Sequence, residues 1–279
     1  AEVERLEVPG DVLASVVRGR KRAAPHTIFL PGLCSNAYAY LLGFPEAAKE
    51  QGGVVAIEGD QPCVPGFRSF SWDAPKLHRR IEAAFAASGV ALGDDEAVTL
   101  VGYSQGAALA EQLVQRWPRR YARLVLIGAP TDPSPSHFRT AEGVVTMSCS
   151  LDVPWRMKEA ARGIARTGVR STYVEMPGCT HGNLARGDET LGAAFASAMT
   201  KPPPALEEEW YVSIDGEQSG PLSLVEAQRW VSERPVDAEL HCWCEGFDDW
   251  LPVDKVSHFR GLRKRPAPAP RPVPGPRGG

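Results

Sequence analysis

Residues 97–114 read Ala-Val-Thr-Leu-Val-Gly-Tyr-Ser-Gln-Gly-Ala-Ala-Leu-Ala-Glu-Gln-Leu-Val, and this stretch decides the fold. The apolar run Ala97–Val101 predicts a buried strand, and the alanine- and leucine-rich run Gln105–Trp117 predicts a helix that Pro118 ends. Ser104 stands at the sharp turn between them, and the glycines at 102 and 106 lack the Cβ atoms that would clash there. This arrangement is typical of a nucleophile elbow, which holds a serine Oγ exposed above a parallel sheet.

Short apolar runs alternate with helical patterns from residue 27 to about residue 176. The predicted strands are Thr27–Leu30, Gly53–Glu58, Ala97–Val101, Arg123–Ile127, Val144–Cys149 and Ser171–Met176, and the predicted helices are Phe44–Glu50, Ala74–Ala87, Gln105–Trp117, Trp155–Thr167 and Glu189–Met199. Runs at Val3–Val8 and Val12–Val17 predict an antiparallel hairpin at one sheet edge. The fold class is therefore α/β, with a mostly parallel central sheet flanked by helices.

A serine hydroxyl becomes a useful nucleophile when a base takes its proton and a third group orients that base. His181 follows the last predicted strand of the sheet, and Asp152 follows the strand before it. Because the carboxyl ends of parallel strands gather at one edge, we expect Ser104, Asp152 and His181 to meet there. Asp132, after the preceding strand, is the alternative acid, and we favour Asp152 because its strand neighbours the one before His181.

An oxyanion hole needs two backbone N–H groups, one from the residue after the nucleophile and one from the loop after an earlier strand. The residue after the serine is Gln105. The second loop is Pro31-Gly32-Leu33-Cys34-Ser35-Asn36, and we expect Leu33 to be its donor, with Gly32 making the tight turn.

These residues resemble the α/β-hydrolase family over about residues 3–200. The motifs that carry the resemblance are Pro31-Gly32-Leu33, Gly102-Tyr-Ser-Gln-Gly106, Ser150-Leu-Asp152-Val-Pro154 and Thr180-His181-Gly182, in that order. The resemblance implies an acyl-enzyme on Ser104, with His181 acting as base and then as acid and Asp152 orienting it. The Ser-Gln-Gly form is similar to small esterases, acyl-protein thioesterases and cutinases.

Two departures from larger family members matter. Many members have His-Gly where this sequence has Pro31-Gly32, so no role of that histidine is carried over. Only about fifteen residues separate Ile127 from Val144, where larger members insert a helical lid. We therefore expect an open, shallow site without a large lid, suited to short or exposed acyl groups.

The six cysteines contain no CxxC pair, so a structural zinc site is not expected. Cys34 and Cys63 follow strands expected to be neighbours, and so do Cys149 and Cys179, so two disulfides are geometrically conceivable. With no visible secretory signal we favour free thiols and a cytoplasmic protein, the alternative being export after removal of a leader.

The net charge of −3 averages three regions. A hydrolase-like domain (1–200) is neutral, residues 201–255 hold 4 basic and 13 acidic residues, and residues 256–279 hold 6 basic and no acidic ones. A Pro-rich linker (201–206), a small domain (207–256) and a basic Pro-rich tail (257–279), expected to be disordered, complete the chain. Nothing here favours nucleic acid or a membrane span.

The small domain is rich in aromatic residues and resembles the bacterial GYF-type domain in Glu209-Trp-Tyr-Val212, Ser219-Gly-Pro-Leu222, Glu245-Gly-Phe247 and Asp249-Trp250-Leu-Pro252. Gly-Phe stands where the full motif has Gly-Tyr-Phe, so ligand specificity is not carried over. The resemblance implies a small α+β fold and an aromatic groove for proline-rich peptides, the chain's own tail included. The groove candidates are Trp210, Tyr211, Trp230, Trp243, Phe247 and Trp250.

The sequence thus predicts a serine hydrolase that cleaves a small acyl ester or thioester without a cofactor or metal, joined to a peptide-binding module. The alternative is an idle hydrolase fold that serves as an adaptor through its C-terminal module. Fold and triad residues do not choose between ester, thioester and amide.

Overall fold

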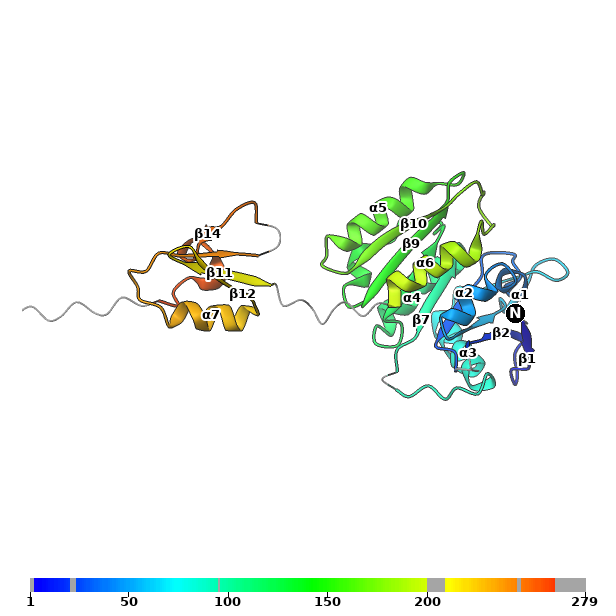
Figure 1. Cartoon of the computed structure of the whole chain (residues 1–279). Helices are drawn as coiled ribbons and strands as arrows, with labels where there is room; N and C mark the ends of the chain where they lie inside the picture. The colour runs from blue at the N-terminus through cyan, green and yellow to red at the C-terminus, as the bar shows by residue number, and fades with distance from the viewer. Residues whose placement is uncertain (1–2, 21–23, 95, 200–208, 245–246, 264–279) are drawn as a thin grey trace, which may run out of the picture. The chain divides into compact units, whose positions relative to one another are not determined.

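The chain folds into two compact units, Ala1–Pro202 and Pro203–Gly279, in a computed structural model that describes residues 3–20, 24–94, 96–199, 209–244 and 247–263 (Figure 1). The predicted linker and the prolines of the predicted tail lie outside the described residues. Each unit has its own sheet and its own hydrophobic core.

The first unit is built on an eight-stranded sheet in the order β1-β2-β4-β3-β7-β8-β9-β10. The strands are β1 Glu4–Leu6, β2 Ala14–Arg18, β3 Thr27–Leu30, β4 Gly53–Ile57, β7 Thr99–Tyr103, β8 Arg123–Ile127, β9 Gly143–Cys149 and β10 Ser171–Met176. The six from β3 to β10 are parallel, and β1 and β2 form the predicted antiparallel hairpin at one edge. The predicted α/β class with a mostly parallel sheet is confirmed.

Helices cover both faces of this sheet (Figure 1). They are α1 Ala37–Leu41, α2 Pro45–Glu50, α3 Ala74–Ala87, α4 Gln105–Arg116, α5 Pro154–Ala165 and α6 Gly187–Met199. One core joins α3, α4 and α5 to one face, and a second core joins α1, α2 and α6 to the other. Alternate residues of each central strand face opposite cores, which is why these strands read as continuous apolar runs. No helix in the described part of the chain is long and apolar enough to cross a membrane.

The connection after β4 is more elaborate than the sequence suggests. It contains a small hairpin of β5 (Gln61–Pro62) and β6 (Arg68–Ser69), and Ser35 from the loop after β3 bridges to Arg68. By contrast, between β8 and β9 the structure contains only a 3-10 turn, Pro135–Phe138. No lid is inserted in that segment.

Four cysteines form two disulfides, so the prediction of free thiols is wrong for them. Cys34 pairs with Cys63 at a Cα–Cα distance of 5.5 Å, and Cys149 pairs with Cys179 at 5.0 Å. Cys34 and Cys63 lie in the loops after the adjacent parallel strands β3 and β4, and Cys149, the last residue of β9, pairs with Cys179 in the loop after the adjacent strand β10. The neighbouring strands bring each pair within bonding distance.

The second unit is a four-stranded antiparallel sheet in the order β12-β11-β13-β14, packed against one helix. Its elements are β11 Trp210–Ile214, β12 Glu217–Leu222, α7 Leu224–Ser232, β13 Leu240–Trp243 and β14 Leu251–Pro252, followed by 3-10 turns at Val253–Lys255 and Ser257–Phe259. A capping box begins α7, because the side chains of Ser223 and Glu226 each accept from the other residue's backbone N–H.

Candidate active site

Ser104 occupies a strained turn between β7 and α4. Its φ is +52°, which a non-glycine residue rarely adopts, and its N–H donates to the Ile127 carbonyl at 2.8 Å. A Cβ at Gly102 would lie 2.3 Å from the Gly106 carbonyl oxygen, and one at Gly106 would lie 2.2 Å from the Leu30 carbonyl oxygen. Only glycine fits at these two positions, and the turn holds the serine at the carboxyl edge of the sheet.

His181 connects Ser104 to Asp152. Its Nε2 lies 2.9 Å from Ser104 Oγ, and its Nδ1 lies 2.7 Å from Asp152 Oδ2. The tautomer that satisfies both contacts carries its proton on Nδ1, which donates to the carboxylate and leaves Nε2 to accept from the serine. Asp132 instead forms an ion pair with Arg156 at 2.9 Å. The structure therefore brings together the three residues favoured from the sequence and leaves the alternative acid apart.

Two tyrosine hydroxyls hold the loop that carries His181. The Tyr103 hydroxyl donates to the Asn183 carbonyl at 2.9 Å and accepts from the Gly182 N–H at 2.8 Å. The Tyr40 hydroxyl donates to the Gly182 carbonyl at 2.7 Å. The Tyr103 ring contacts the His181 imidazole edge-on, with the ring centroids 5.6 Å apart. Burial raises the pKa of the Tyr103 phenol well above its usual range. Tyr103 therefore stays protonated and able to donate.

The disulfide Cys149–Cys179 attaches the same loop to the end of β9, three residues before the aspartate. Two hydrogen bonds accompany it, from Leu151 N–H to the Cys179 carbonyl at 3.1 Å and from Gly178 N–H to Ser150 Oγ at 2.8 Å. The carboxylate and the imidazole are thus borne on two loops that are covalently joined.

The loop after β3 lies against the nucleophile. A Cβ at Gly32 would be 3.1 Å from Ser104 Cβ, and the backbone N–H groups of Leu33 and Gln105 have no hydrogen-bond partner among the described residues. The Gln105 side chain is committed elsewhere, since it bonds both the N–H and the carbonyl of Phe70 at 3.0 and 2.8 Å. These unpaired donors are the two expected from the sequence for an oxyanion hole.

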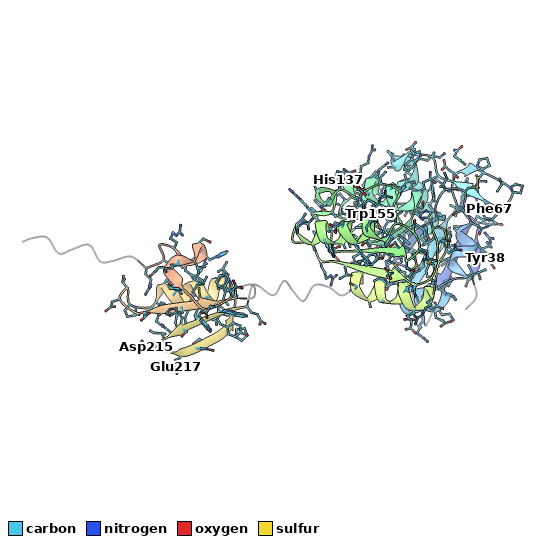
Figure 2. The ribbon with its side chains drawn as sticks, turned by 90° about the horizontal axis from the view of Figure 1, so that it is seen from above. Tyr38, Phe67, His137, Trp155, Asp215 and Glu217 are labelled. Atoms are coloured by element: carbon cyan, nitrogen blue, oxygen red, sulfur yellow. A yellow bond between two sulfur atoms is a disulfide. The ribbon has the colours of Figure 1, made fainter. Side chains whose placement is uncertain are left out.

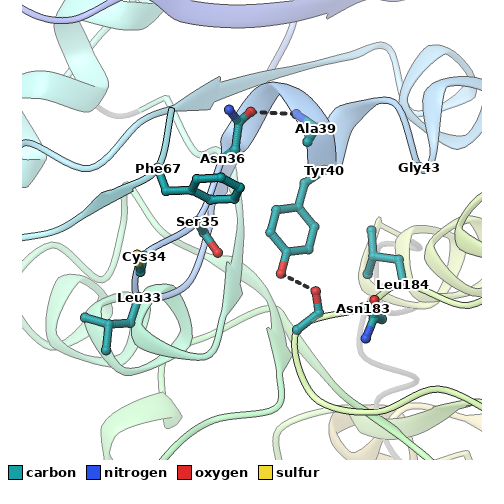
Figure 3. Close-up of a pocket in the computed structure, with 11 residues that line it drawn as sticks. Leu33, Cys34, Ser35, Asn36, Ala39, Tyr40, Gly43, Phe67, Asn183 and Leu184 are labelled. Carbon is teal, nitrogen blue, oxygen red and sulfur yellow. Dashed lines mark hydrogen bonds between the residues drawn. The ribbon is translucent and has the colours of Figure 1, made fainter. Parts of the chain in front are cut away.

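A pocket of about 470 Å³ adjoins this loop and the residues after His181 (Figure 3). It is lined by Leu33, Cys34, Ser35, Asn36, Ala39, Tyr40, Gly43, Phe67, Gly182, Asn183 and Leu184. Leu33 and Leu184 lie at opposite ends, with the Tyr40 ring between them (Figure 3). Sequence reasoning missed this pocket and the hydrogen bonds of both tyrosine hydroxyls, because no local pattern connects residues 40 and 103 with residues 182–183.

In the second unit, one groove candidate proves to be a core residue. Trp210 is fully buried and packs edge-on against Phe247 at 5.9 Å and Phe259 at 5.0 Å. Its position in the core rules it out as a surface contact for a peptide, so this part of the sequence prediction is wrong. Phe247 is half-buried against it.

The other candidates are half-buried. Tyr211 and Trp243 are paired across β11 and β13, with ring centroids 5.8 Å apart. Trp230 lies beneath the Arg234 guanidinium at 4.4 Å, and Trp250 follows the loop before β14. Of these four half-buried candidates, as the structure describes them, only Tyr211 and Trp243 contact each other through their rings.

Comparisons with known proteins give one family match, in the second unit, and several structural matches. Residues 210–259 match the family model of GYF domain 2. The structure is similar to the crystal structure of esterase PE8 (TM-score 0.51, 17% identity, 70% of this chain and 100% of that chain) and to that of a bacterial membrane phospholipase A (0.51, 15%, 70% and 85%). It is also similar to an uncharacterized protein from Bacillus cereus (0.50, 12%, 64% and 60%). The comparison with curated proteins found no match.

Proposed function

Proceeding from an α/β-hydrolase fold in the first unit and a GYF domain in the second, we propose that the protein is a serine hydrolase that cleaves carboxylic esters or thioesters. The observation that carries the proposal is the hydrogen-bonded series Asp152–His181–Ser104 at 2.7 and 2.9 Å. A serine held on a strained elbow, with an oriented imidazole at its Oγ, has the geometry that acyl transfer requires.

The reaction follows from these contacts. Ser104 Oγ attacks the acyl carbon while its proton passes to His181 Nε2, and the developing oxyanion accepts from the N–H groups of Leu33 and Gln105. The C–O or C–S bond then breaks, and His181 returns the proton to the leaving alcohol or thiol. Water attacks the acyl-enzyme by the same route, with Asp152 stabilising the imidazolium in both steps.

A fluorophosphonate probe tests the proposal directly. We expect it to label the folded protein and to leave Ser104→Ala unlabelled. Asp152→Asn should lower the labelling rate by roughly a hundredfold or more, whereas the matched control Asp132→Asn should change it less than threefold. Failure to label the native protein, or equal labelling of Ser104→Ala, would favour the idle-fold alternative, in which the GYF domain performs the main task.

The pocket beside the oxyanion loop supports a modest acyl group. Its volume of about 470 Å³ and its lining of leucine, phenylalanine and tyrosine side chains suit an apolar chain directly attached to the reacting carbon. Soluble p-nitrophenyl esters graded by chain length should react fastest while the chain fits this pocket. Matched esters and thioesters of the best acyl group then assign the leaving group.

For the GYF domain we propose binding of proline-rich peptides, with the chain's own tail as one ligand. The support is the family match and the charge contrast, 4 basic against 13 acidic residues in 201–255 and 6 basic against none in 256–279. A labelled peptide of residues 263–279 should bind a protein truncated after residue 263, and salt should weaken that binding. If the peptide does not bind, or binds equally well to the Trp243→Ala variant, the tail is not a ligand of an aromatic groove on the GYF domain.

A further inference from the structure

Large apolar side chains are exposed at several positions of the first unit. Nine such residues are at least 37% exposed, including Leu33 at 67%, Leu151 at 66% and Trp72 at 60%. We call this set the apolar rim, and its members are Leu13, Leu33, Leu42, Val64, Phe67, Trp72, Leu151, Val153 and Trp155. Single exposed apolar side chains are ordinary, so what matters is where these nine lie.

All nine lie at the carboxyl edge of the parallel sheet. Seven belong to the segments that follow β3, β4 and β9. Leu42 is the C-cap of α1, and the next residue, Gly43, lines the pocket beside the His181 loop. Leu13 precedes β2, whose first residue pairs with the last residue of β4. No large apolar residue in the described part of the first unit is exposed at the opposite edge. The asymmetry places the rim around the candidate active site.

Ser104 is at the middle of this rim. It follows β7, and β4 and β9 each lie two places away from β7, on opposite sides. At about 4.8 Å between strands, the rim extends for roughly 20 Å across the edge, with the serine at its centre. In the view from above, Phe67 and Trp155 lie well apart on the first unit (Figure 2). A single short ester bound in the pocket beside Tyr40 would contact only part of the rim, so the rim is wider than such a substrate requires.

We propose that the apolar rim docks the first unit onto the surface of aggregated acyl-ester lipid, so that the ester enters the site from that surface. Trp72 and Trp155 on the rim suit a boundary between water and acyl chains, where the amphipathic indole ring gains most. A second copy of the chain seated on the same surface would cover Ser104. Aggregated acyl-ester lipid on this surface would instead present its esters to Ser104, which is why we choose it as the partner. That this lipid is also the substrate rests on the proposed function, whereas the binding of the rim to a lipid surface does not.

Flotation with phosphatidylcholine vesicles tests the docking without catalysis, using full-length Ser104→Ala protein. We expect it to float with the vesicles, and 0.5 M salt should not release it, because the contact is apolar. The double variant Trp72→Ser/Trp155→Ser should bind at least tenfold more weakly. The matched control is Val225→Ser in the second unit, where the valine is 62% exposed but far from this rim in the chain, and it should bind normally. Circular dichroism checks that each variant is folded.

Absence of flotation, flotation lost in 0.5 M salt, or equal binding by the double variant would overturn the proposal. So would sedimentation showing a dimer of the native chain that the double variant abolishes, since the rim would then be an interface between copies.

Kinetics on tributyrin separates this proposal from the proposed function. The native rate should rise sharply once the ester exceeds its solubility and forms droplets, and the double variant should lose that rise while keeping its rate on a soluble acetate ester within threefold. Vesicle binding without any esterase activity would sink the proposed function and leave the docking intact. Activity on soluble esters without vesicle binding or a droplet effect would do the reverse.

Discussion

The two units of this chain use cysteine in opposite ways. In the first unit four cysteines form disulfides that fix the loops around Ser104, one ending at the loop with Leu33 and one at the loop with His181. In the second unit Cys242 and Cys244 remain thiols and are buried in the core. The site loops keep large side chains such as Leu33 and Leu151 exposed and therefore bury little apolar area, so covalent links hold them. A thiol inside a core instead packs as a small apolar group.

Position along the strands explains the difference. Each disulfide joins the carboxyl-terminal ends of two adjacent strands, or the loops that leave them, at the same edge of the sheet. Cys242 and Cys244 are two positions apart along the chain, with Cys242 in β13 and Cys244 just beyond its end, and both contribute to one core. Their surroundings are those of core residues.

Reduction should have the largest effect and should act on one unit only. Closed loops with sequence separations of 29 and 30 residues are each worth about 3–4 kcal/mol, so reducing both should remove about 7 kcal/mol from the first unit. Calorimetry of the full chain with and without dithiothreitol should show one transition moving down and the other unchanged. Thiol titration of the unfolded, unreduced chain should find two thiols, and finding six would break the comparison.

Removing the disulfide nearest the triad should cost about half as much stability and should also impair turnover. Cys149→Ser/Cys179→Ser should lower the free energy of unfolding by about 3–4 kcal/mol and lower kcat about tenfold, because the two loops bearing Asp152 and His181 lose their link. The matched change in the second unit, Cys242→Ser, should leave kcat unchanged. Esterase assays well below the unfolding temperature separate the two effects, and an unchanged kcat in the first variant would assign the disulfide to stability alone.

Tyr103→Phe should have a smaller effect that appears mainly in kcat. The variant leaves the Gly182 N–H and the Asn183 carbonyl without their shared partner, which costs about 2 kcal/mol and loosens the loop that carries His181. The matched control is Tyr121→Phe, which removes a buried hydroxyl bonded to His78 at 2.6 Å in a different part of the same unit. Both variants should lose stability, but only Tyr103→Phe should lower kcat. Equal kcat values would show that Tyr103 does not position the imidazole.

The sequence was sufficient for the parts of the fold that depend on continuous apolar runs. The predicted strands Thr27–Leu30, Arg123–Ile127 and Ser171–Met176 and the predicted helix Ala74–Ala87 have the bounds found in the structure. The strand before the serine was placed two residues early, because Gly102 and Tyr103 read as part of the turn yet continue β7. Strand β12, Glu-Gln-Ser-Gly-Pro-Leu, was missed because it has no alternating apolar pattern and is exposed along most of its length.

The candidate site was predictable where a local motif carries it and not where distant segments meet. The elbow fixes Ser104 and Gln105, and strand order points to Asp152 and His181. The disulfides, the Tyr40 and Tyr103 hydroxyls and the pocket depend on contacts between segments 29 to 142 residues apart, such as Tyr40 with Gly182. Trp210 was misplaced because a tryptophan reads the same in a small core as in a groove.

The smallest effect we expect concerns alkaline pH and again separates the two units. Burial raises the pKa of the Cys242 thiol to about 12, so the folded second unit keeps a proton that the unfolded chain releases near pH 9. A raised folded-state pKa gives stability that is complete below the unfolded pKa and is lost as the pH rises toward 12, and the loss at pH 9.5 is about 1 kcal/mol. Tyr103 and Tyr121 of the first unit have raised pKa values too, but their unfolded values lie near 10, so each of them costs that unit only about 0.2 kcal/mol at pH 9.5. Between pH 7.5 and pH 9.5, calorimetry should therefore show a larger fall in the transition of the second unit than in that of the first, and Cys242→Ala should remove most of the fall in the second unit. An equal shift in that variant would show that Cys242 is not the titrating group.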